Sequence, residues 1–175
     1  YSVSVICPKG PGDPARQVID DVYIYKYRPA PEARGLMGFV LEFTYSWLRT
    51  AKLSVDVWLR EPFEALQACN PPDTIFLIGG FFKYLMGKPF TFDHHDINPE
   101  LYEAKFGRRD LAYRLIVALE RWTFRTADIS IATNESYREI ALTRGGMSED
   151  RVFVVRSGPD VSKVRPVPPV PSLKK

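Results

Sequence analysis

Residues 90–100 read FTFDHHDINPE, and this stretch decides how the rest of the chain is interpreted. Its alternating apolar start predicts the end of a buried strand, and the NPE at 98–100 predicts an N-cap, a first-turn proline and a first-turn acid of a helix. Residues 93–96, the DHHD cluster, contain both histidines of the protein, His94 and His95. In open α/β sheets, ligands bind outside the carboxyl ends of the strands. The DHHD cluster is therefore a candidate site, and the alternative is that its histidines only hydrogen-bond to neighbouring loops.

Strands and helices are expected to alternate on both sides of this stretch. Apolar runs and periodic apolar stripes predict strands at 3–6, 22–27, 64–69 (a weak one), 89–92, 128–132 and 151–155, and helices at 36–60, 74–86, 99–106, 110–126 and 136–143. Gly87 is expected to be the C-cap of the helix 74–86. Strands separated by helices predict an α/β fold with a doubly wound, parallel, Rossmann-like sheet that carries helices on both faces.

The tail differs from the rest of the chain. Residues 164–175 carry four prolines and show no periodic pattern. We expect a Rossmann-like domain over residues 1–160 and an extended, proline-rich linker over 161–175. A ligand for an SH3-type domain is the alternative for the tail.

Composition excludes several classes of protein. A chain of 175 residues with 45% hydrophobic and 26% charged residues is typical of one ordinary globular domain. The net charge of +3, with scattered Lys and Arg, does not favour a nucleic-acid partner. No apolar run reaches the roughly 18 residues of a membrane span, and we expect no signal peptide. Cys7 and Cys69 form neither a disulfide framework nor a zinc spacing, so they are expected to be buried free thiols in a reducing cytoplasm.

A metal site is a weaker interpretation of the DHHD cluster. Its side chains are suitable ligands, but consecutive residues point apart and rarely bind one ion. We therefore expect no metal and no cofactor.

Three segments together resemble family-4-like glycosyltransferases with the GT-B architecture, specifically the N-terminal half of these enzymes. The first is NPPD at 70–73 with GKP at 87–89 and the DHHD cluster, and the second is ER at 120–121 followed by ADISIATN at 127–134. The third is RVFVVRSGPD at 151–160, which departs from the family pattern because Ser157 replaces the usual Asn before Gly. That departure affects a hinge turn more than the chemistry.

The resemblance implies a retaining glycosyltransferase that moves a sugar from a nucleotide-sugar donor to a saccharide or lipid-linked acceptor. His95 matches the family's histidine that contacts the transferred sugar, and Asp96 is expected as the second catalytic residue. Four residues are expected to bind substrate: Asn70, Asp93, His94 and Glu100. For Glu100, a role in complementing the helix dipole is the alternative. His94 is expected to face away from the cleft if His95 faces into it.

The resemblance also implies that residues 1–175 are the acceptor-side half of a two-domain enzyme, inactive alone. The family has a first strand before residues 3–6 and a donor domain after residue 166. We therefore expect unpaired strand edges beside 3–6 and 90–92, and self-association of the fragment. The alternatives to a transferase are a sugar epimerase of the same architecture and a binding module without activity.

Membrane contact is expected to be peripheral at most, at the inner face of a membrane, in an otherwise cytoplasmic protein. The helix 36–60 carries Trp47 and Trp58 together with basic residues, a mixture that suits an interfacial helix. The alternative is that both tryptophans pack in the core.

Overall fold

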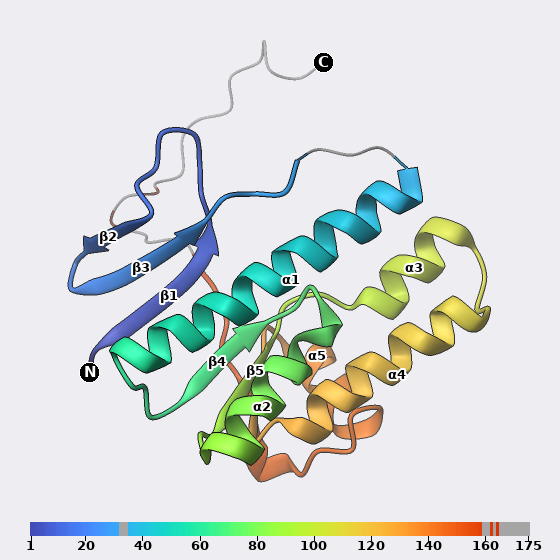
Figure 1. Ribbon diagram of the computed structural model, residues 1–175. Coiled ribbons are helices and arrows are strands. Elements are labelled where there is room, and N and C mark those ends of the chain that lie inside the picture. The colour runs from blue at the N-terminus through green and yellow to red at the C-terminus, as the bar shows by residue number, and fades with distance from the viewer. Residues whose placement is uncertain (32–34, 159–161, 163, 165–175) are drawn as a thin grey trace.

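A computed structural model describes residues 1–31, 35–158, 162 and 164 of the chain. Strands and helices alternate as expected, and the fold is α/β and Rossmann-like (Figure 1). The elements are β1 (Val3–Pro8), β2 (Arg16–Ile19), β3 (Val22–Tyr27), α1 (Gly35–Arg60), β4 (Leu66–Cys69), η1 (Asp73–Ile75), α2 (Phe76–Met86), β5 (Phe90–His94), α3 (Asn98–Phe106), α4 (Leu111–Thr126), β6 (Ile129–Ala132), α5 (Glu135–Thr143), η2 (Glu149–Arg151) and β7 (Val152–Val154).

The strands form two sheets. The larger sheet has the order β4-β5-β6-β7 and is entirely parallel, as a succession of strand–helix–strand units requires. The smaller sheet has the order β1-β3-β2, in which β1 is parallel to β3 and β2 is antiparallel to it.

The antiparallel strand β2 was not expected from the sequence. It pairs with β3 through a two-residue turn at Asp20 and Asp21, whose φ angles are +50° and +62°. A tight hairpin turn of this kind needs positive φ at both central residues, and Asp tolerates that conformation better than most residues do. The Asp-Asp pair was a weaker signal than the usual Asn-Gly or Asp-Gly, so residues 16–19 were not recognised as a strand.

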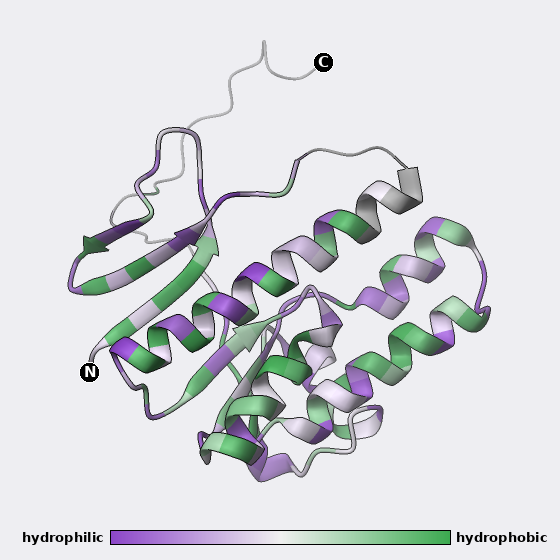
Figure 2. Ribbon diagram, viewed as in Figure 1, coloured by the Kyte–Doolittle hydropathy of each residue, from purple (hydrophilic) through white to green (hydrophobic). Residues whose placement is uncertain are grey.

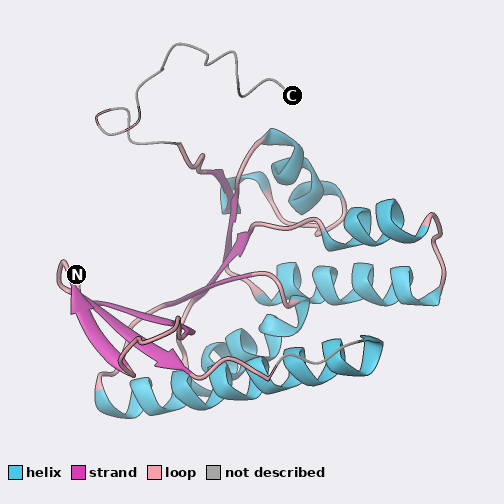
Figure 3. Cartoon of the chain, turned by 90° about the horizontal axis from the view of Figure 1, so that it is seen from above, coloured by secondary structure: helices cyan, strands magenta, loops and turns pink. Residues whose placement is uncertain are grey.

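The core lies between the larger sheet and the helices. On β5, Phe90, Phe92 and His94 are buried and face the helices, and their neighbours in the same core cluster include Phe82 of α2 and Phe124 of α4. The described helices α1, α2, α4 and α5 pack on this face of the strands (Figure 3).

The opposite face of the larger sheet carries the alternate residues of the same strands. Ile129 of β6 is 39% exposed and Phe153 of β7 is 49% exposed, because strand residues point alternately to the two faces. Among the described elements, no helix covers this face, so the expected helices are found on one side of the sheet.

The expected unpaired edge beside residues 90–92 is wrong. β5 lies inside the sheet and is hydrogen-bonded to β4 on one side and to β6 on the other. The reason is that residues 66–69, expected only as a weak strand, form a full partner of β5. In the described part of the chain, the end strands of the two sheets are β1, β2, β4 and β7, and the second edge of β1 has no strand partner, as expected beside residues 3–6.

One glycine inside α2 and another at the end of this helix have clear roles. A Cβ atom on Gly79 would lie 2.6 Å from the ring of Phe90, so glycine is what lets this helix approach the sheet. Gly87 caps the helix in the left-handed conformation at φ +64°, which confirms the expected C-cap.

The tryptophans of α1 are partly buried and pack against the core, as the alternative to an interfacial helix expected. Trp47 donates from Nε1 to the carbonyl of Thr74 at 3.3 Å, and the ring of Trp58 lies 6.5 Å from that of Phe82. No helix in the described part of the chain has the length and apolar character needed to cross a bilayer.

Candidate functional site

The DHHD cluster is divided between the two faces of the larger sheet. His94, the last residue of β5, is completely buried on the helix-covered face, whereas the side chain of His95 is 46% exposed. This follows from the alternation of side chains along a strand, and it confirms that the two histidines point to opposite sides. Only His95 is accessible to a dissolved molecule.

His95 is held by a chain of polar side chains on the uncovered face. Its Nε2 lies 3.1 Å from Oδ1 of Asp93, and Gln67 of β4 donates from Nε2 to Oδ2 of Asp93 at 3.0 Å. We call these three residues the His95 chain. This contact engages Nε2 of His95, and in the described part of the chain no hydrogen bond or ion pair involves its Nδ1. The arrangement therefore fixes the His95 ring and leaves its second nitrogen available to a ligand.

Cys69 lies beside this chain, in register with Asp93 on the neighbouring strand. It is an exposed free thiol, so the expectation that it is buried is wrong, whereas Cys7 is half-buried. The desolvation of its sulfur by surrounding atoms, and next the carboxylate of Asp93, raise the pKa of the Cys69 thiol. A raised pKa makes the thiol a poor nucleophile at neutral pH.

Asn70 fixes the loop that follows β5. Its Oδ1 accepts hydrogen bonds from the backbone N–H groups of His95 at 2.9 Å and Asp96 at 3.1 Å. Its Nδ2 donates to the carbonyl of Asp96 at 2.6 Å and to Asp73 Oδ1 at 3.0 Å. Because Asn70 is 3% exposed and all these partners are protein atoms, it positions the candidate site from behind.

Asp73 extends this support to the start of α3. Its Oδ2 accepts from Nδ2 of Asn98 at 2.7 Å, and its carbonyl accepts from Oγ1 of Thr123 at 2.8 Å. Burial raises the pKa of the Asp73 carboxyl, and the hydrogen bonds from Asn98 and Asn70 oppose that shift. The loop of residues 95–98 is therefore tied by hydrogen bonds to Asn70, just after β4, and to Asp73 of η1, which is itself bonded to α4.

Unlike the amide of Asn70, the carboxylate of Asp96 has no hydrogen-bond or ion-pair partner among the described residues. The residue is partly buried, and in the described part of the chain no hydrogen bond or ion pair involves its side-chain oxygens. Its backbone is held by Asn70, so the carboxylate is positioned and still able to accept hydrogen bonds from a ligand.

His94 is a core residue. Its ring lies 5.5 Å from Phe92, 5.2 Å from Phe124 and 5.1 Å from Tyr137, and neither ring nitrogen makes a hydrogen bond. The nearest carboxylate oxygen, Oε1 of Glu120, is 3.6 Å from Nε2. This environment leaves no surface on which a sugar could contact His94, which argues against the expected direct role in substrate binding.

Glu100 also points to a protein partner. Arg144, just after α5, donates from Nη1 and Nη2 to the two oxygens of Glu100 at 2.5 and 3.1 Å. The same guanidinium donates from Nε and Nη2 to the oxygens of Glu120 at 2.5 and 2.9 Å, and Glu120 is completely buried. We call Glu100, Glu120 and Arg144 the ion triad.

The electrostatics of the ion triad follow from its geometry. Partial burial works against the charged form of Glu100, but the hydrogen bonds from Arg144 outweigh it and hold the pKa of Glu100 below its ordinary value. The two carboxylates likewise raise the pKa of Arg144 against the effect of burial. The triad joins the start of α3 to α4 and to the end of α5, behind the loop that carries His95.

Sequence reasoning identified the DHHD cluster and missed two of its supports. Gln67 could have been found, because its place on a strand next to β5 puts it on the face of Asp93. Arg144 had no local signal, because its carboxylate partners are 24 and 44 residues away in the chain. In the described part of the chain, no three His, Cys, Asp or Glu side chains lie close enough together to hold a metal ion.

The fold and this site define a Rossmann-like domain with a polar cluster at the carboxyl ends of its central strands. Residues 1–163 match the family model of Glycosyltransferase Family 4, and the chain belongs to that family. No curated protein is similar enough to this chain to count as a relative.

Proposed function

We propose that this chain is the acceptor-side half of a retaining glycosyltransferase, which transfers a sugar from a nucleotide-sugar donor to a saccharide or lipid-linked acceptor. The observation that carries the proposal is the exposed His95, held by Asp93 and Gln67 at the carboxyl end of β5, in a domain of Glycosyltransferase Family 4. The donor is held by a second domain outside residues 1–175, so this chain has no transferase activity alone.

The chemistry of transfer fits the groups that this half supplies. The transition state resembles an oxocarbenium ion, and the leaving group is an anionic diphosphate, which the donor half binds with cations and helix N-termini. The acceptor half must hold the sugar and the attacking hydroxyl in line. His95 contacts the transferred sugar through its free ring nitrogen, and the Asp96 carboxylate accepts a hydrogen bond from a hydroxyl group.

The remaining predicted residues support these two from the protein side. Asp93 orients the imidazole of His95, and Asn70 holds the backbone of residues 95–96. His94 and Glu100 contribute through the core and the ion triad, without touching the sugar. These assignments separate the groups that meet substrate from those that position them.

The experiment is a transfer assay with the complete protein that contains this chain. Labelled UDP-, GDP- and ADP-sugars are supplied with a panel of saccharide and lipid-linked acceptors, and the anomeric configuration of the product is determined by NMR. The proposal predicts acceptor-dependent transfer with the donor's configuration retained. Sugar interconversion without any acceptor would instead identify an epimerase, and the absence of turnover with every donor would leave a binding module.

A second measurement addresses the division of labour between the halves. Calorimetry of residues 1–175 with the donor used by the complete protein is expected to show no binding, because the groups that grip the diphosphate are in the other domain. Micromolar binding of a nucleotide sugar to residues 1–175 would contradict the proposed division.

A further inference from the structure

Helix α1 carries a line of exposed side chains along one side. Each member of this line is more than half exposed, and the members are Leu41, Leu48, Lys52 and Leu59. They follow one another at intervals of seven, four and seven residues, so they lie on one side of the helix. Trp47 and Trp58, which pack against the core, lie on a different side of α1. Figure 3 shows α1 at one edge of the described chain, where the exposed line is open to a partner.

The spacing of this line matches the heptad repeat of a coiled coil. With the half-buried Tyr45 and Val55 included, the residues at 41, 45, 48, 52, 55 and 59 alternate at intervals of four and three. That alternation is the a/d seam along which two helices pack, and we call these residues the α1 seam. Figure 2 shows hydrophobic and hydrophilic residues interspersed along α1. A surface helix needs apolar residues on its core face only, so leucines on the outer side indicate a second helix as partner.

Opposite charges border the α1 seam on one flank. Arg49 and Asp56 are seven residues apart and occupy equivalent positions beside the seam. Arg49 is exposed and contacts the ring of Tyr45 at 5.9 Å, and it has no carboxylate partner among the ion pairs of the described residues. Asp56 accepts from Lys52 of the same helix at 2.5 Å, and this hydrogen bond holds the pKa of the Asp56 carboxyl below its ordinary value. The flank therefore presents one cation and one ionised carboxylate, a helical repeat apart.

This charge pattern is complementary to itself when the helix is reversed. In an antiparallel pair of identical helices related by a two-fold axis, the same flank of each helix faces the other. An axis midway between residues 53 and 54 places Leu48 opposite Leu59 of a second copy. The same alignment brings Arg49 close to Asp56 of the second copy. Symmetry makes each of these contacts twice.

Other alignments of two α1 helices bring like charges together. A parallel pair places Lys52 directly against Lys52 of the second copy. An antiparallel pair that is shifted to match Leu41 with Leu59 places Arg49 beside Arg49. A charged residue at a single seam position selects alignment in this way, because mismatched alignments leave charges repelling one another at the interface.

We propose that α1 is a homodimer interface, in which it packs antiparallel against α1 of a second copy of this chain. Leu48 and Leu59 of both copies form the apolar centre, and pairs between Arg49 and Asp56 of opposite copies flank it. Helices that overlap over residues 47–60 are in contact for about 21 Å, at about 1.5 Å per residue. Such an interface is small among specific complexes, so monomer and dimer should interconvert at micromolar concentrations. The proposal is independent of the proposed glycosyl transfer.

The first test is sedimentation velocity of the 175-residue chain from about 1 µM to about 500 µM, which brackets the dissociation constants of small, reversible interfaces. Leu48→Ser should raise the dissociation constant of the dimer at least about tenfold, because each dimer loses two buried leucines. The control is Leu115→Ser on α4, which changes a leucine of similar exposure and should leave the dissociation constant unchanged. Circular dichroism and the thermal midpoint verify that the variants fold.

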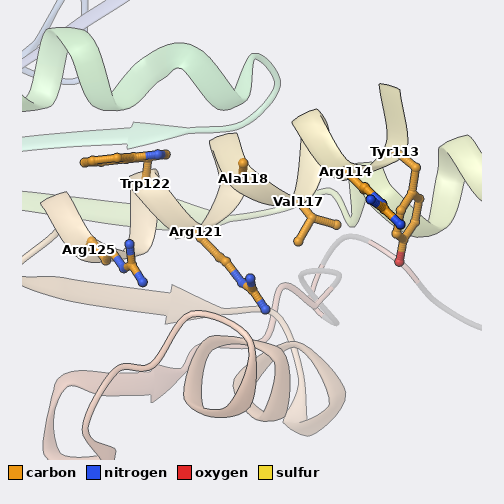
Figure 4. Close-up of a pocket in the computed structure, with 7 residues that line it drawn as sticks. All are labelled: Tyr113, Arg114, Val117, Ala118, Arg121, Trp122 and Arg125. Carbon is orange, nitrogen blue, oxygen red and sulfur yellow. The ribbon is translucent and has the colours of Figure 1, made fainter. Parts of the chain in front are cut away.

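Charge exchange tests the antiparallel alignment. Arg49→Glu alone and Asp56→Arg alone should each weaken dimerisation about three- to tenfold at low salt, because both flanking pairs become repulsive. Mixing these two variants should restore the association, since both pairs are then complementary in the mixed dimer. The control Arg125→Glu removes an exposed arginine of α4 that contacts the ring of Trp122 at 6.0 Å, much as Arg49 contacts Tyr45 (Figure 4). It should leave the dimer unchanged.

Cross-linking reads the alignment directly. Cysteines are introduced in a Cys69→Ser background, because Cys69 is an exposed thiol. With a short thiol cross-linker, the double variant Leu48→Cys/Leu59→Cys should form covalent dimers, and neither single variant should. Cross-linking of Leu48→Cys alone would identify a parallel pair and overturn the antiparallel arrangement.

Three other results would overturn the proposal. One is a chain that remains monomeric at about 500 µM. Another is weakening by Arg125→Glu equal to that by Arg49→Glu, which would reduce the effect to net charge. The third is a complete protein that stays monomeric although the 175-residue chain dimerises, which would show that another part of that protein covers the α1 seam.

Discussion

Replacing Arg144 by methionine tests how the ion triad supports the loop that carries His95. The substitution removes the cation and keeps an unbranched chain of similar length. The side chain of Glu120 is completely buried, and the substitution leaves its carboxylate without its two charged hydrogen bonds. Removing one partner of a buried ion pair costs about 3–5 kcal/mol of unfolding free energy, because the remaining charge stays desolvated.

That cost is a large fraction of the stability of an ordinary domain, which is about 5–15 kcal/mol. For a domain of this size it corresponds to a fall in the thermal midpoint of roughly 6–20 °C. Urea unfolding followed by circular dichroism measures the free energy directly. The pair with Glu100 contributes less to the total, because the side chain of Glu100 is 38% exposed and water screens it.

Two controls make this prediction specific to the triad. Arg138→Met removes an arginine of α5 whose partner, Glu149, lies 3.6 Å away with an 83% exposed side chain, and it should cost at most about 1 kcal/mol. Adding Glu120→Gln to Arg144→Met removes the stranded charge and should recover a substantial part of the loss. A loss below about 1 kcal/mol for Arg144→Met, or no recovery in the double variant, would show that the buried charge of Glu120 does not depend on Arg144.

Three further predictions concern packing, the thiol and acid. Gly79→Ala should lower the unfolding free energy by about 1–3 kcal/mol, because its Cβ would meet the Phe90 ring at 2.6 Å. The control Gly80→Ala, whose Cβ would have its nearest atom at 3.5 Å, should be neutral or stabilising in thermal denaturation. Equal effects of the two substitutions would rule out the close approach of α2 to the sheet at Gly79. Asp93→Asn should lower the pKa of Cys69 and speed its alkylation at neutral pH about two- to fivefold, and an unchanged rate would contradict the influence of that carboxylate. Folding lowers the pKa of Glu100, so its contribution to stability is present above the pKa of the unfolded state and is lost as the pH falls through the pKa of the folded state. The Glu100→Gln variant should therefore lose less stability between pH 6 and about pH 3 than the unmodified chain does. Parallel losses in the two proteins would count against the pair with Arg144.

The sequence revealed those parts of the site that depend on local patterns. Strand periodicity placed the DHHD cluster at a strand end and put His94 and His95 on opposite faces, as the buried and exposed side chains confirm. Turn chemistry gave Gly87 correctly and missed the hairpin at residues 20–21, whose Asp-Asp pair is an uncommon choice for positive φ.

The parts that could not be predicted depend on contacts between distant segments. Glu100 looked like a helix-start acid near a cleft, and only the folded chain brings it to Arg144. Asn70 was expected to bind substrate, and its partners include the backbone groups of His95 and Asp96, 25 and 26 residues away. Polar residues at strand ends can bind ligands or hold loops, and the sequence does not distinguish these roles.

The proposed function requires that His95 face the transferred sugar from the uncovered side of the sheet. The direct test is steady-state turnover of the complete protein with a defined donor and acceptor, compared between the unmodified enzyme and His95→Ala. We expect turnover to fall about ten- to a thousandfold with an unchanged thermal midpoint, because a transition-state contact is lost without loss of core packing. Wild-type turnover in His95→Ala would contradict this placement of His95 and leave the DHHD cluster with a structural role.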